Sequence, residues 1–459
     1  MTEGLFSPPR RALTVGLVLT ITLVAFESLA VATIMPIVAR ELGDFYLYGW
    51  VFSAFFLGSL LGIVVVGGLI DRGGLVRPFL GGLGLFALGL VISGLAPSMP
   101  ILVAGRFLQG LGAGAIPPTA YVAIGRSLPD SLRPRMFAIL STAWVLPGVV
   151  GPALSGVVAE QLHWRVVFLG LLPLIGVAGA MTVAAVAAVP GPADASALEG
   201  NASAESRRRL PAAARVALGA GLVLAGLTSG DLLVAAVLVA VGLVLAVPAF
   251  RSLTPPGTLR AAHGLPAAVL LRGVLTFAFF APDTYVPFML VEWRGVSASI
   301  AGIVLTAATL TWTAGAWVQA RWIDRIGARR LISAGFATVA IGIAATATVL
   351  SPAVPVAVAV LTWGIVGLGM GLAYSPLSLV VLRAAAGGEQ GSATSGLQLS
   401  DTIGTTLGAG VAGAIVAAGD RVGAAPWVGL LVAIAIGASI ALAGLVVARR
   451  LGPGIGPSR

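Results

Sequence analysis

The sequence contains no cysteine and no lysine, and its only histidines are His163 and His263. Without cysteine, the chain has no disulfide, no thiolate nucleophile and no cysteine metal site. Two isolated histidines do not make a metal centre, so we expect no metal and no cofactor. The sequence also lacks nucleotide-binding GxxxxGK[ST], GxSxG and HExxH motifs. We therefore expect no ATP hydrolysis and no hydrolase chemistry, and a chain that is not an enzyme.

Charge is scarce as well. Charged residues make up 10% of the chain and hydrophobic residues 58%, whereas soluble domains carry about 25% charged residues. The mean hydropathy is +1.04. The 62 glycines and 28 prolines fit membrane helices, where neighbouring helices satisfy the interrupted backbone. This composition excludes a soluble globular protein and predicts an all-α polytopic membrane protein.

Apolar runs of about 20 residues, long enough to cross the hydrocarbon layer, occur in a six-two-six order along the chain. We expect an N-terminal six-helix bundle at 1–189 and a C-terminal six-helix bundle at 250–459. Two additional helices are expected at 212–249, giving 14 membrane helices. The segment 190–211, rich in Pro, Ala, Ser and Glu, is expected to be a flexible cytoplasmic linker. Because the two middle runs are short, a re-entrant hairpin is the alternative to two full crossings.

The arginines predict the orientation, because basic residues are retained on the cytoplasmic side of short loops. With a cytoplasmic N-terminus, 21 of the 27 arginines fall on cytoplasmic segments and 4 on the outer side. We expect both termini in the cytoplasm, and the exclusive use of arginine suggests a GC-rich bacterial genome, hence a bacterial cytoplasmic (inner) membrane. This asymmetry explains the net charge of +10 without nucleic acid.

A charged turn occurs twice. Residues 67–77 read GGLIDRGGLVR and residues 314–330 read AGAWVQARWIDRIGARR. In each copy an Asp-Arg pair closes an apolar run and precedes a glycine and further arginines. The repeat indicates two related halves, as in many secondary transporters, where the substrate site lies between the halves.

Four segments resemble motifs of the major facilitator superfamily. The first charged turn, 67–77, resembles the signature between the second and third helices, and 106–114 (RFLQGLGAG) resembles the fourth-helix motif. Residues 147–156 (PGVVGPALSG) are similar to the fifth-helix motif of antiporters. Residues 26–36 (FESLAVATIMP) are similar to the first-helix motif of drug:proton antiporters. The resemblance implies two pseudo-symmetric six-helix bundles plus two extra central helices, as in the fourteen-helix branch of those exporters.

The sequence departs from this branch at three positions. Glu27 stands where the branch usually has Asp, Leu29 where it usually has Thr, and Ala320 replaces the leading glycine of the second charged turn. These departures concern the subfamily and the substrate, not the fold.

Charges inside the apolar runs are the first functional candidates. A charge at the centre of a membrane helix costs about 2.5–3.5 kcal/mol or more, so each needs a reason. Burial favours the neutral form of a carboxyl group and a nearby arginine favours its charged form, so an acid that moves between these surroundings can carry a proton. Five residues fall in this class: Glu27, Arg106, Arg272, Asp283 and Asp401.

We expect proton coupling at Glu27, Arg106, Asp283 and Asp401, with Glu27 dominant. The resemblance suggests that Arg106 lies within reach of Glu27. Each of these residues also has an alternative, purely structural interpretation. Glu27 can be a protonated acid hydrogen-bonded inside the bundle, Arg106 can pair with backbone carbonyls, and Asp283 can be solvated near the outer headgroups. The acid Asp401 can be satisfied by hydroxyls on its own helix, which belong to Ser400, Thr402, Thr405 and Thr406.

The charged turns suggest a gate at the cytoplasmic helix ends. Asp71 is expected to face the N-terminal end of the helix that begins near Ser392, because a helix N-terminus attracts anions. Simple positive-inside anchoring is the alternative, which explains the arginines but not the aspartates. The expected gating residues are Asp71, Arg72, Gly74, Arg77, Asp324 and Arg325.

The fifth-helix motif should permit close helix approach and a bend, since glycine has no side chain and proline removes a hydrogen bond. A general small-residue packing face is the alternative. The motif residues are Gly148, Gly151, Pro152 and Gly156. We also expect a mostly apolar substrate cavity. Its candidate wall residues are Gln109, Trp144, Phe277, Phe280, Trp312, Trp363 and Tyr374.

The leading hypothesis is a proton-coupled secondary-active exporter, or antiporter, of amphipathic small molecules or drugs that works by alternating access. One alternative is an exporter of a lipid or a secreted natural product. Another is a non-transporting membrane receptor or scaffold, which would have no reason to keep intramembrane charges. We expect a monomer whose partners are a small-molecule substrate, protons and the lipid bilayer, with no nucleic acid.

Overall fold

The computed structural model describes residues 4–73, 75–129, 145–187, 201–384 and 390–452, together with 132, 136, 139, 140 and 143. All regular elements of this part of the chain are helical. Among the described residues, 13 helices are long and apolar enough to cross a membrane. The fold is therefore an all-α, multi-pass membrane fold, as the composition predicts.

The first half of the chain forms six principal helices. They are α1 (Pro8–Leu42), α2 (Tyr48–Gly73), α3 (Val76–Gly94), α4 (Met99–Ser127), α6 (Val145–Gln161) and α8 (Leu171–Ala187), with the short η1 (Phe45–Leu47) and α7 (Trp164–Leu169) between them. The expected fifth helix corresponds to α6. Its 17 residues are fewer than a full span, and much of the sequence before Val145 lies outside the described residues. This explains a count of 13 instead of the expected 14.

The second half repeats the arrangement. Its principal helices are α12 (Leu265–Asp283), α14 (Ala298–Ile326), α15 (Ala328–Thr346), α16 (Val358–Ala384), α17 (Gln390–Arg421) and α18 (Pro426–Val447). Short elements lie between these helices and at either end of the set: η2 (Thr258–Arg260), α13 (Val286–Phe288), η3 (Met289–Trp293), η4 (Ala347–Leu350) and η5 (Ala448–Arg450).

The two halves use one pairing scheme. The second and third helices of each half pack on its fourth helix, which pairs α2 and α3 with α4, and α14 and α15 with α16. The first helix of each half packs on its fifth and sixth helices. Between the halves, α6 packs on α14 and α17 packs on α2. The structure is thus two pseudo-symmetric six-helix bundles, and the fifth helix of each bundle packs on the second helix of the other.

The central hairpin consists of α10 (Asn201–Thr228) and α11 (Leu232–Leu253), joined by a tight turn in which Asp231 caps α11 through its carboxylate. Both helices contain stretches long enough to cross a membrane, 209–228 and 232–253. The helix α10 begins at Asn201, so the expected linker 190–211 is wrong over 201–211. Alanine, arginine and glutamate are strong helix formers, and they extend the helix beyond its apolar part.

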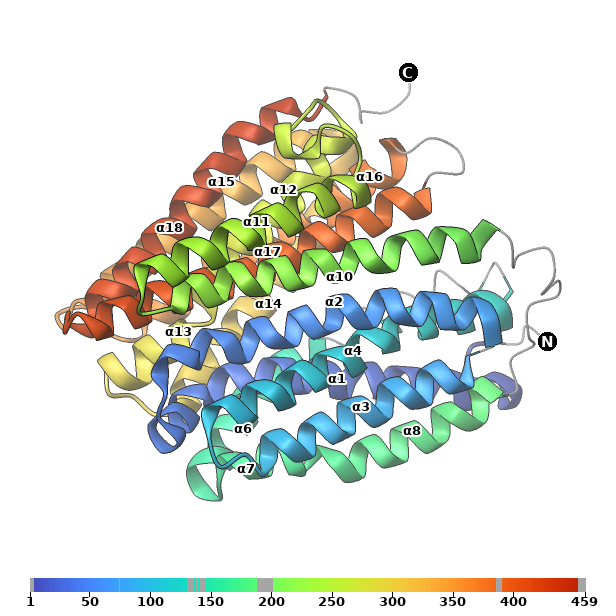
Figure 1. Ribbon diagram of the computed structural model, residues 1–459, viewed down its shortest axis with the longest axis horizontal. Coiled ribbons are helices and arrows are strands. Elements are labelled where there is room, and N and C mark those ends of the chain that lie inside the picture. Colours follow the sequence, from blue (N-terminus) through green and yellow to red (C-terminus); the bar gives the residue numbers. More distant parts are fainter. Residues whose placement is uncertain are drawn as a thin grey trace.

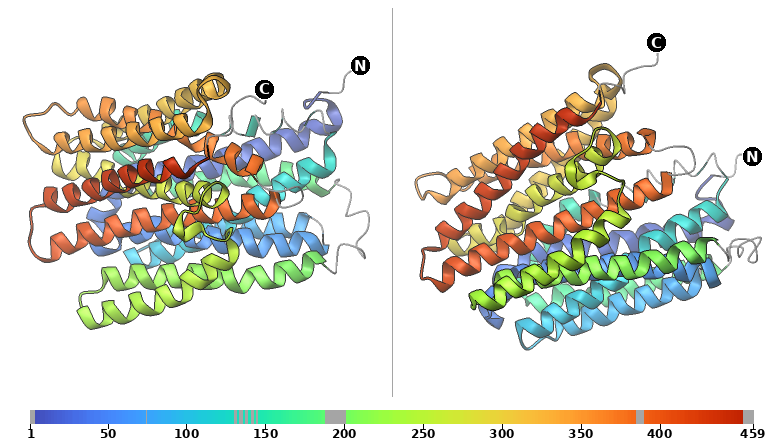
Figure 2. Two further views of the ribbon diagram at one scale, coloured as in Figure 1. Left: turned by 90° about the horizontal axis from the view of Figure 1, so that it is seen from above. Right: turned by 45° about the horizontal axis from the view of Figure 1, so that its top comes forward.

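The hairpin lies along the junction of the two bundles, where α10 packs on α2 of the first half and on α17 of the second (Figures 1 and 2). A small hydrophobic cluster, separate from the main core, joins these helices. It includes Leu57, Leu60, Val216, Phe250 and Leu399. The hairpin therefore holds onto both halves, while α11 presents most of its surface outward, with Leu232 and Val244 more than two-thirds exposed.

The start of α1 and the end of α18 lie on one side of the bundle, which we call the termini side, and we call the opposite side the far side (Figure 1). The helices of the two halves lie closest together on the far side and diverge toward the termini side (Figures 1 and 2). The two sides of the bundle therefore differ in how closely the two halves approach each other.

Candidate functional site

A buried ion pair lies in the middle of the first half. Glu27 on α1 and Arg106 on α4 are 1% and 2% exposed, and Arg106 Nη1 donates a hydrogen bond to Glu27 Oε1. Gln109, one turn further along α4, donates from Nε2 to the same Glu27 oxygen at 3.1 Å. The second carboxylate oxygen, Oε2, is buried without a hydrogen-bond partner. The cluster therefore holds a carboxylate through one oxygen only.

The surroundings hold Arg106 independently of Glu27. Its Nε donates to the carbonyl of Val51 on α2 at 3.2 Å, and its Nη1 donates to Gln109 Oε1 at 3.1 Å. Its guanidinium carbon also lies 4.4 Å from the centroid of the Phe55 ring, within cation–π range. The guanidinium thus has both the acid and a backbone carbonyl as partners. The sequence analysis treated these two kinds of pairing as alternatives, and the structure contains both.

Gln109 was expected in the wall of the substrate cavity, but its side chain is completely buried and bound by the hydroxyl of Ser93 on α3 at 3.0 Å. In this structure it supports the ion pair, and its place in the wall of a substrate cavity stays a prediction. Sequence reasoning missed Ser93, because a single serine in an apolar helix carries no signal by itself.

A second charged cluster lies in the other half. Arg272 on α12 is 3% exposed, and its Nε lies 3.8 Å from Asp401 Oδ1 on α17. Arg272 also donates to the hydroxyl of Ser378, and its guanidinium lies 3.5 Å from the centroid of the Tyr374 ring. The Tyr374 hydroxyl donates to Asp401 Oδ2 at 3.3 Å. Asp401 therefore has a cationic and an aromatic partner from two other helices.

The alternative in which hydroxyls on its own helix satisfy Asp401 does not hold for the three threonines. Thr402, Thr405 and Thr406 donate to backbone carbonyls one turn earlier on α17, at 3.0, 3.0 and 2.7 Å. Threonine hydroxyls in helices commonly bond in this way. Arg272 was recognised as an intramembrane charge, but its pairing with Asp401 could not be read from spacing, because 129 residues separate them along the chain.

Asp283 lies at the end of α12, where its carboxylate accepts a hydrogen bond from Trp363 Nε1 on α16 at 3.2 Å. It lies inside the candidate span 265–293 and has a defined partner, unlike the freely solvated acid of the alternative interpretation. Trp363 itself is completely buried. In this conformation it exposes no surface to a cavity and binds Asp283, and its place in the cavity wall stays a prediction.

Aromatic rings connect the two acids of the second half. Phe279 stacks on Trp363 at 5.7 Å between centroids and meets Trp312 edge-on at 5.4 Å. Trp312 in turn lies 5.4 Å from Tyr374. Of the expected wall residues, Phe277, Phe280, Trp312 and Tyr374 are partly buried, and Trp144 lies outside the described residues. Phe279, the centre of this ring cluster, was not expected.

The two halves are joined on the far side by polar contacts. Arg40 at the end of α1 pairs with Glu292 of η3, which belongs to the other half. Glu160 near the end of α6 accepts hydrogen bonds from the backbone N–H and the hydroxyl of Ser299 at 3.0 and 2.8 Å. Ser299 lies in the first turn of α14, so the carboxylate also faces the positive end of a helix.

Aromatic packing reinforces the same junction. Tyr48 at the start of α2 lies 4.9 Å from Tyr285, and Phe45 stacks on Phe288 at 4.7 Å. Both pairs join one half to the other, and Tyr48 and Tyr285 are almost completely buried. We call these ring pairs, together with the Arg40–Glu292 and Glu160–Ser299 contacts, the far-side seam.

The antiporter-like motif on α6 forms part of the contact between the halves. A Cβ atom added at Gly148 would lie 2.1 Å from Thr309 Cγ2 on α14, and one at Gly156 would lie 2.8 Å from Ser299 Cα. On the other side of the contact, a Cβ atom added at Gly302 of α14 would lie 2.6 Å from the carbonyl oxygen of Pro152. Gly151 instead faces Phe26 of its own half at an ordinary 3.4 Å. Two of the three glycines therefore permit close contact between the halves.

The expected gating residues are only partly described. Asp324 and Arg325 lie exposed at the end of α14, and Arg77 is exposed on α3. The side chains of Asp71 and Arg72, and residue Gly74, lie outside the described part of the chain. The expected contact between Asp71 and the start of α17 is therefore left as a prediction.

Within the described residues, no group of three or more His, Asp or Glu residues could hold a metal ion.

Comparison with known proteins gives consistent results. A family model for the Major Facilitator Superfamily matches residues 17–289. The chain is 28% identical over 421 residues to a probable multidrug-efflux transporter of Mycobacterium tuberculosis, covering 88% of each chain. It is 26% identical over 419 residues to the multidrug transporter protein MdtP of Bacillus subtilis, covering 88% of this chain and 75% of the other.

Solved structures share the fold. A bacterial homolog of the human lysosomal transporter Spinster, in an inward-facing and unoccupied conformation, aligns with a TM-score of 0.66 at 16% identity, covering 97% of this chain and 99% of that one. An autoinhibited POT family peptide transporter aligns with a TM-score of 0.66 at 18% identity, covering 97% and 98%. With its family model spanning more than half the sequence and its two six-helix bundles, the chain belongs to the Major Facilitator Superfamily and is a membrane transporter.

Proposed function

We propose that this transporter is a proton-coupled exporter of amphipathic small molecules, an antiporter that works by alternating access in a bacterial cytoplasmic membrane. Its relatives in Mycobacterium tuberculosis and Bacillus subtilis are named as multidrug transporters, which supports drug-like cargo. The distribution of arginines supports an orientation with the termini side in the cytoplasm.

The buried Glu27–Arg106 pair carries the proposal. A carboxylate that is 1% exposed in the middle of a membrane helix is retained only when it has a function or a firm partner. Protonation neutralises Glu27, yet Arg106 keeps the Val51 carbonyl, Gln109 and the Phe55 ring. Both protonation states are therefore compatible with the fold, which a proton carrier requires.

The divergence of the halves toward the termini side supports the second element of the proposal, alternating access (Figure 1). In the proposed orientation this conformation is closed to the outside by the far-side seam and receives substrate from the cytoplasm. Opening requires breaking the Arg40–Glu292 and Glu160–Ser299 contacts. Protonation of Glu27 from the outside, after substrate release, returns the protein to the conformation described here.

Proteoliposomes with an imposed pH gradient test the proposal, with a fluorescent lipophilic cation as the substrate. We expect substrate movement driven by the gradient in the wild type and loss of that coupling in Glu27→Gln, while Glu27→Asp retains part of it. Movement that ignores the gradient and persists in Glu27→Gln contradicts proton coupling at this site. If no small molecule moves, comparison of lipids and metabolites from cells with and without the protein separates lipid or natural-product export from a non-transporting scaffold.

A further inference from the structure

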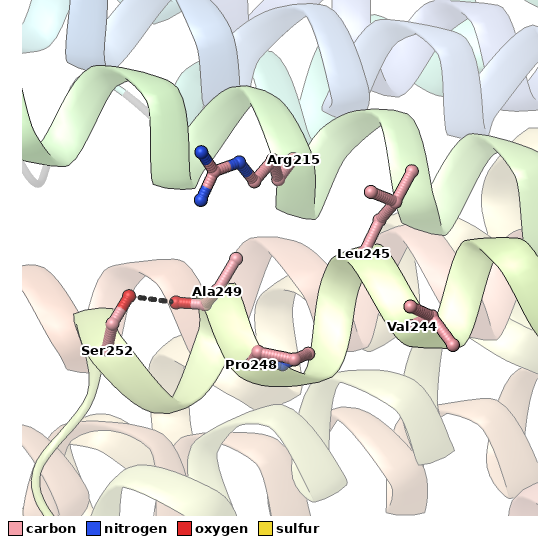
Figure 3. Close-up of a pocket in the computed structure, with 6 residues that line it drawn as sticks. All are labelled: Arg215, Val244, Leu245, Pro248, Ala249 and Ser252. Atoms are coloured by element: carbon pink, nitrogen blue, oxygen red, sulfur yellow. Dashed lines mark hydrogen bonds between the residues drawn. The ribbon is translucent and has the colours of Figure 1, made fainter.

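The central hairpin contains a groove that the transport cycle does not use. It has a volume of about 400 Å³ and lies between α10 and α11 (Figure 3). Its α11 residues fall in the second half of that helix, which runs toward the termini side (Figure 1). Its lining residues are Arg215, Val244, Leu245, Pro248, Ala249 and Ser252. The volume falls in the range of about 300–1,000 Å³ typical of small-molecule sites.

Arg215 is the only charged residue of the lining, and it is exposed. Its side chain leaves α10 and extends over Ala249 toward Ser252 of α11 (Figure 3). Neither 209–228 of α10 nor 232–253 of α11 contains an acidic residue. Among the described residues, no carboxylate forms an ion pair with Arg215. The guanidinium therefore presents its donors to the groove without a protein anion.

The depth of Arg215 decides what kind of anion can reach it. It lies six residues inside the apolar stretch 209–228, or about 9 Å at 1.5 Å per residue. A long arginine side chain at this depth reaches back toward the membrane interface. Phospholipid phosphates lie at that interface, so a lipid phosphate is the anion best placed to reach the guanidinium.

The helix α11 supplies the remaining features of a lipid site. Pro248 has no N–H, so the carbonyl of Val244 in the same lining loses its usual helical donor. A backbone carbonyl that lacks its usual helical donor can accept a hydrogen bond from a headgroup hydroxyl. From Val244 in the lining, which is 71% exposed, α11 continues beyond the groove as an exposed apolar surface, with Val237 and Val241 about half exposed. This surface can hold an acyl chain.

We propose that the groove between α10 and α11 binds an anionic phospholipid, with its phosphate on Arg215 and an acyl chain along the exposed face of α11. A glycerol headgroup supplies the hydroxyl for the Val244 carbonyl, so phosphatidylglycerol is the matching lipid. Because α10 packs on both α2 and α17, the bound lipid attaches the leaflet of the termini side to the helix that spans the junction of the halves.

Lipid binding to the purified full-length protein in detergent tests the proposal, by native mass spectrometry with phosphatidylglycerol and phosphatidylcholine. We expect retention of phosphatidylglycerol by the wild type. Arg215→Gln should weaken its binding about tenfold or more, the loss expected for one charged hydrogen bond. The matched control is Arg251→Gln. Arg251 is also an exposed arginine near the end of α11, but it does not line the groove.

Four outcomes overturn the proposal. They are unchanged binding in Arg215→Gln, equal losses in Arg215→Gln and Arg251→Gln, equal retention of phosphatidylcholine, and equal competition by soluble glycerol phosphate, which would indicate a site for free phosphate. If Arg215→Gln fails to fold, Leu245→Trp fills the groove while keeping the charge. It should also reduce phosphatidylglycerol binding, and unchanged binding in this variant likewise overturns the proposal.

Discussion

At the scale of single residues, Glu27 and Arg106 differ in how much support each has from other groups. Arg106 has the Val51 carbonyl, Gln109 and the Phe55 ring in addition to the acid. Glu27 has Arg106 and Gln109, and its second oxygen has no hydrogen-bond partner. Loss of the arginine should therefore harm the fold more than loss of the acid.

We predict that Arg106→Gln lowers the melting temperature more than Glu27→Gln does. Breaking a buried ion pair from one side costs about 3–5 kcal/mol when the remaining charge is left unpaired. In Arg106→Gln the unpaired acid has to take up a proton to stay buried, so the stability of this variant should fall as pH rises. Thermal melts of both variants at two pH values check this, and equal melting temperatures would contradict it.

The Arg272–Asp401 pair gives a second prediction. Asp401→Asn removes the acid opposite Arg272 but leaves Ser378 and the Tyr374 ring. We expect a partial loss of transport and a modest loss of stability, about 1–3 kcal/mol. Because the two side chains interact, the effects of Arg272→Met and Asp401→Asn should not add in the double variant. Additive losses in melts of all three variants would show that the pair is not coupled.

These clusters show how much of the site could be predicted from the sequence. The cost of burying charge identifies Glu27, Arg106, Asp283 and Asp401 as residues that need partners, and the structure gives each of them one. The burial cost alone does not identify the partners that come from other helices, such as Trp363 for Asp283. Their positions depend on helix packing, which apolar periodicity does not encode.

At the scale of helices, the apolar runs locate the membrane spans because hydrocarbon thickness fixes their length. They do not locate helix ends outside the membrane. The start of α10 at Asn201 lies well before its apolar stretch, which begins at 209, because helix propensity, not hydropathy, sets that end. The motifs on α4 and α6 predict helix contacts better than the apolar runs do. Most of their glycines lie where two helices approach each other closely, which only small side chains permit.

The α6–α14 contact gives a prediction with a matched control. At Gly156 a methyl group would lie 2.8 Å from the backbone of Ser299, whereas at Gly151 it would meet Phe26 at an ordinary 3.4 Å. Overpacking of this kind costs about 1–3 kcal/mol. We expect Gly156→Ala to disfavour the conformation closed on the far side and reduce transport, and Gly151→Ala to change neither. Distances between spin labels on the far side, together with transport rates, check both variants, and equal behaviour would show that the glycines are general packing residues.

At the scale of the whole molecule, the far-side seam holds two otherwise divergent halves together. Its polar contacts are individually weak. An exposed ion pair such as Arg40–Glu292 contributes about 0–1 kcal/mol, and a carboxylate at a helix N-terminus contributes about 0.3–1 kcal/mol. Weak contacts suit a junction that has to open in every cycle, because a single strong contact would trap one conformation.

We therefore predict that removing both polar contacts, by Arg40→Ala with Glu160→Ala, shifts the population toward a conformation open on the far side. A combined loss of about 0.3–2 kcal/mol changes the ratio of the two conformations by about 2–30-fold. Because the chain has no cysteine, spin labels can be attached at Leu162→Cys and Val422→Cys, two exposed positions on the far side of opposite halves. The distance between these labels should lengthen in the variant.

Exchanging the charges, by Arg40→Glu with Glu292→Arg, should leave the distance distribution close to that of the wild type, whereas Arg40→Glu alone should lengthen it. If the exchanged pair lengthens the distance as much as Arg40→Glu alone, the ion pair does not hold the far side closed.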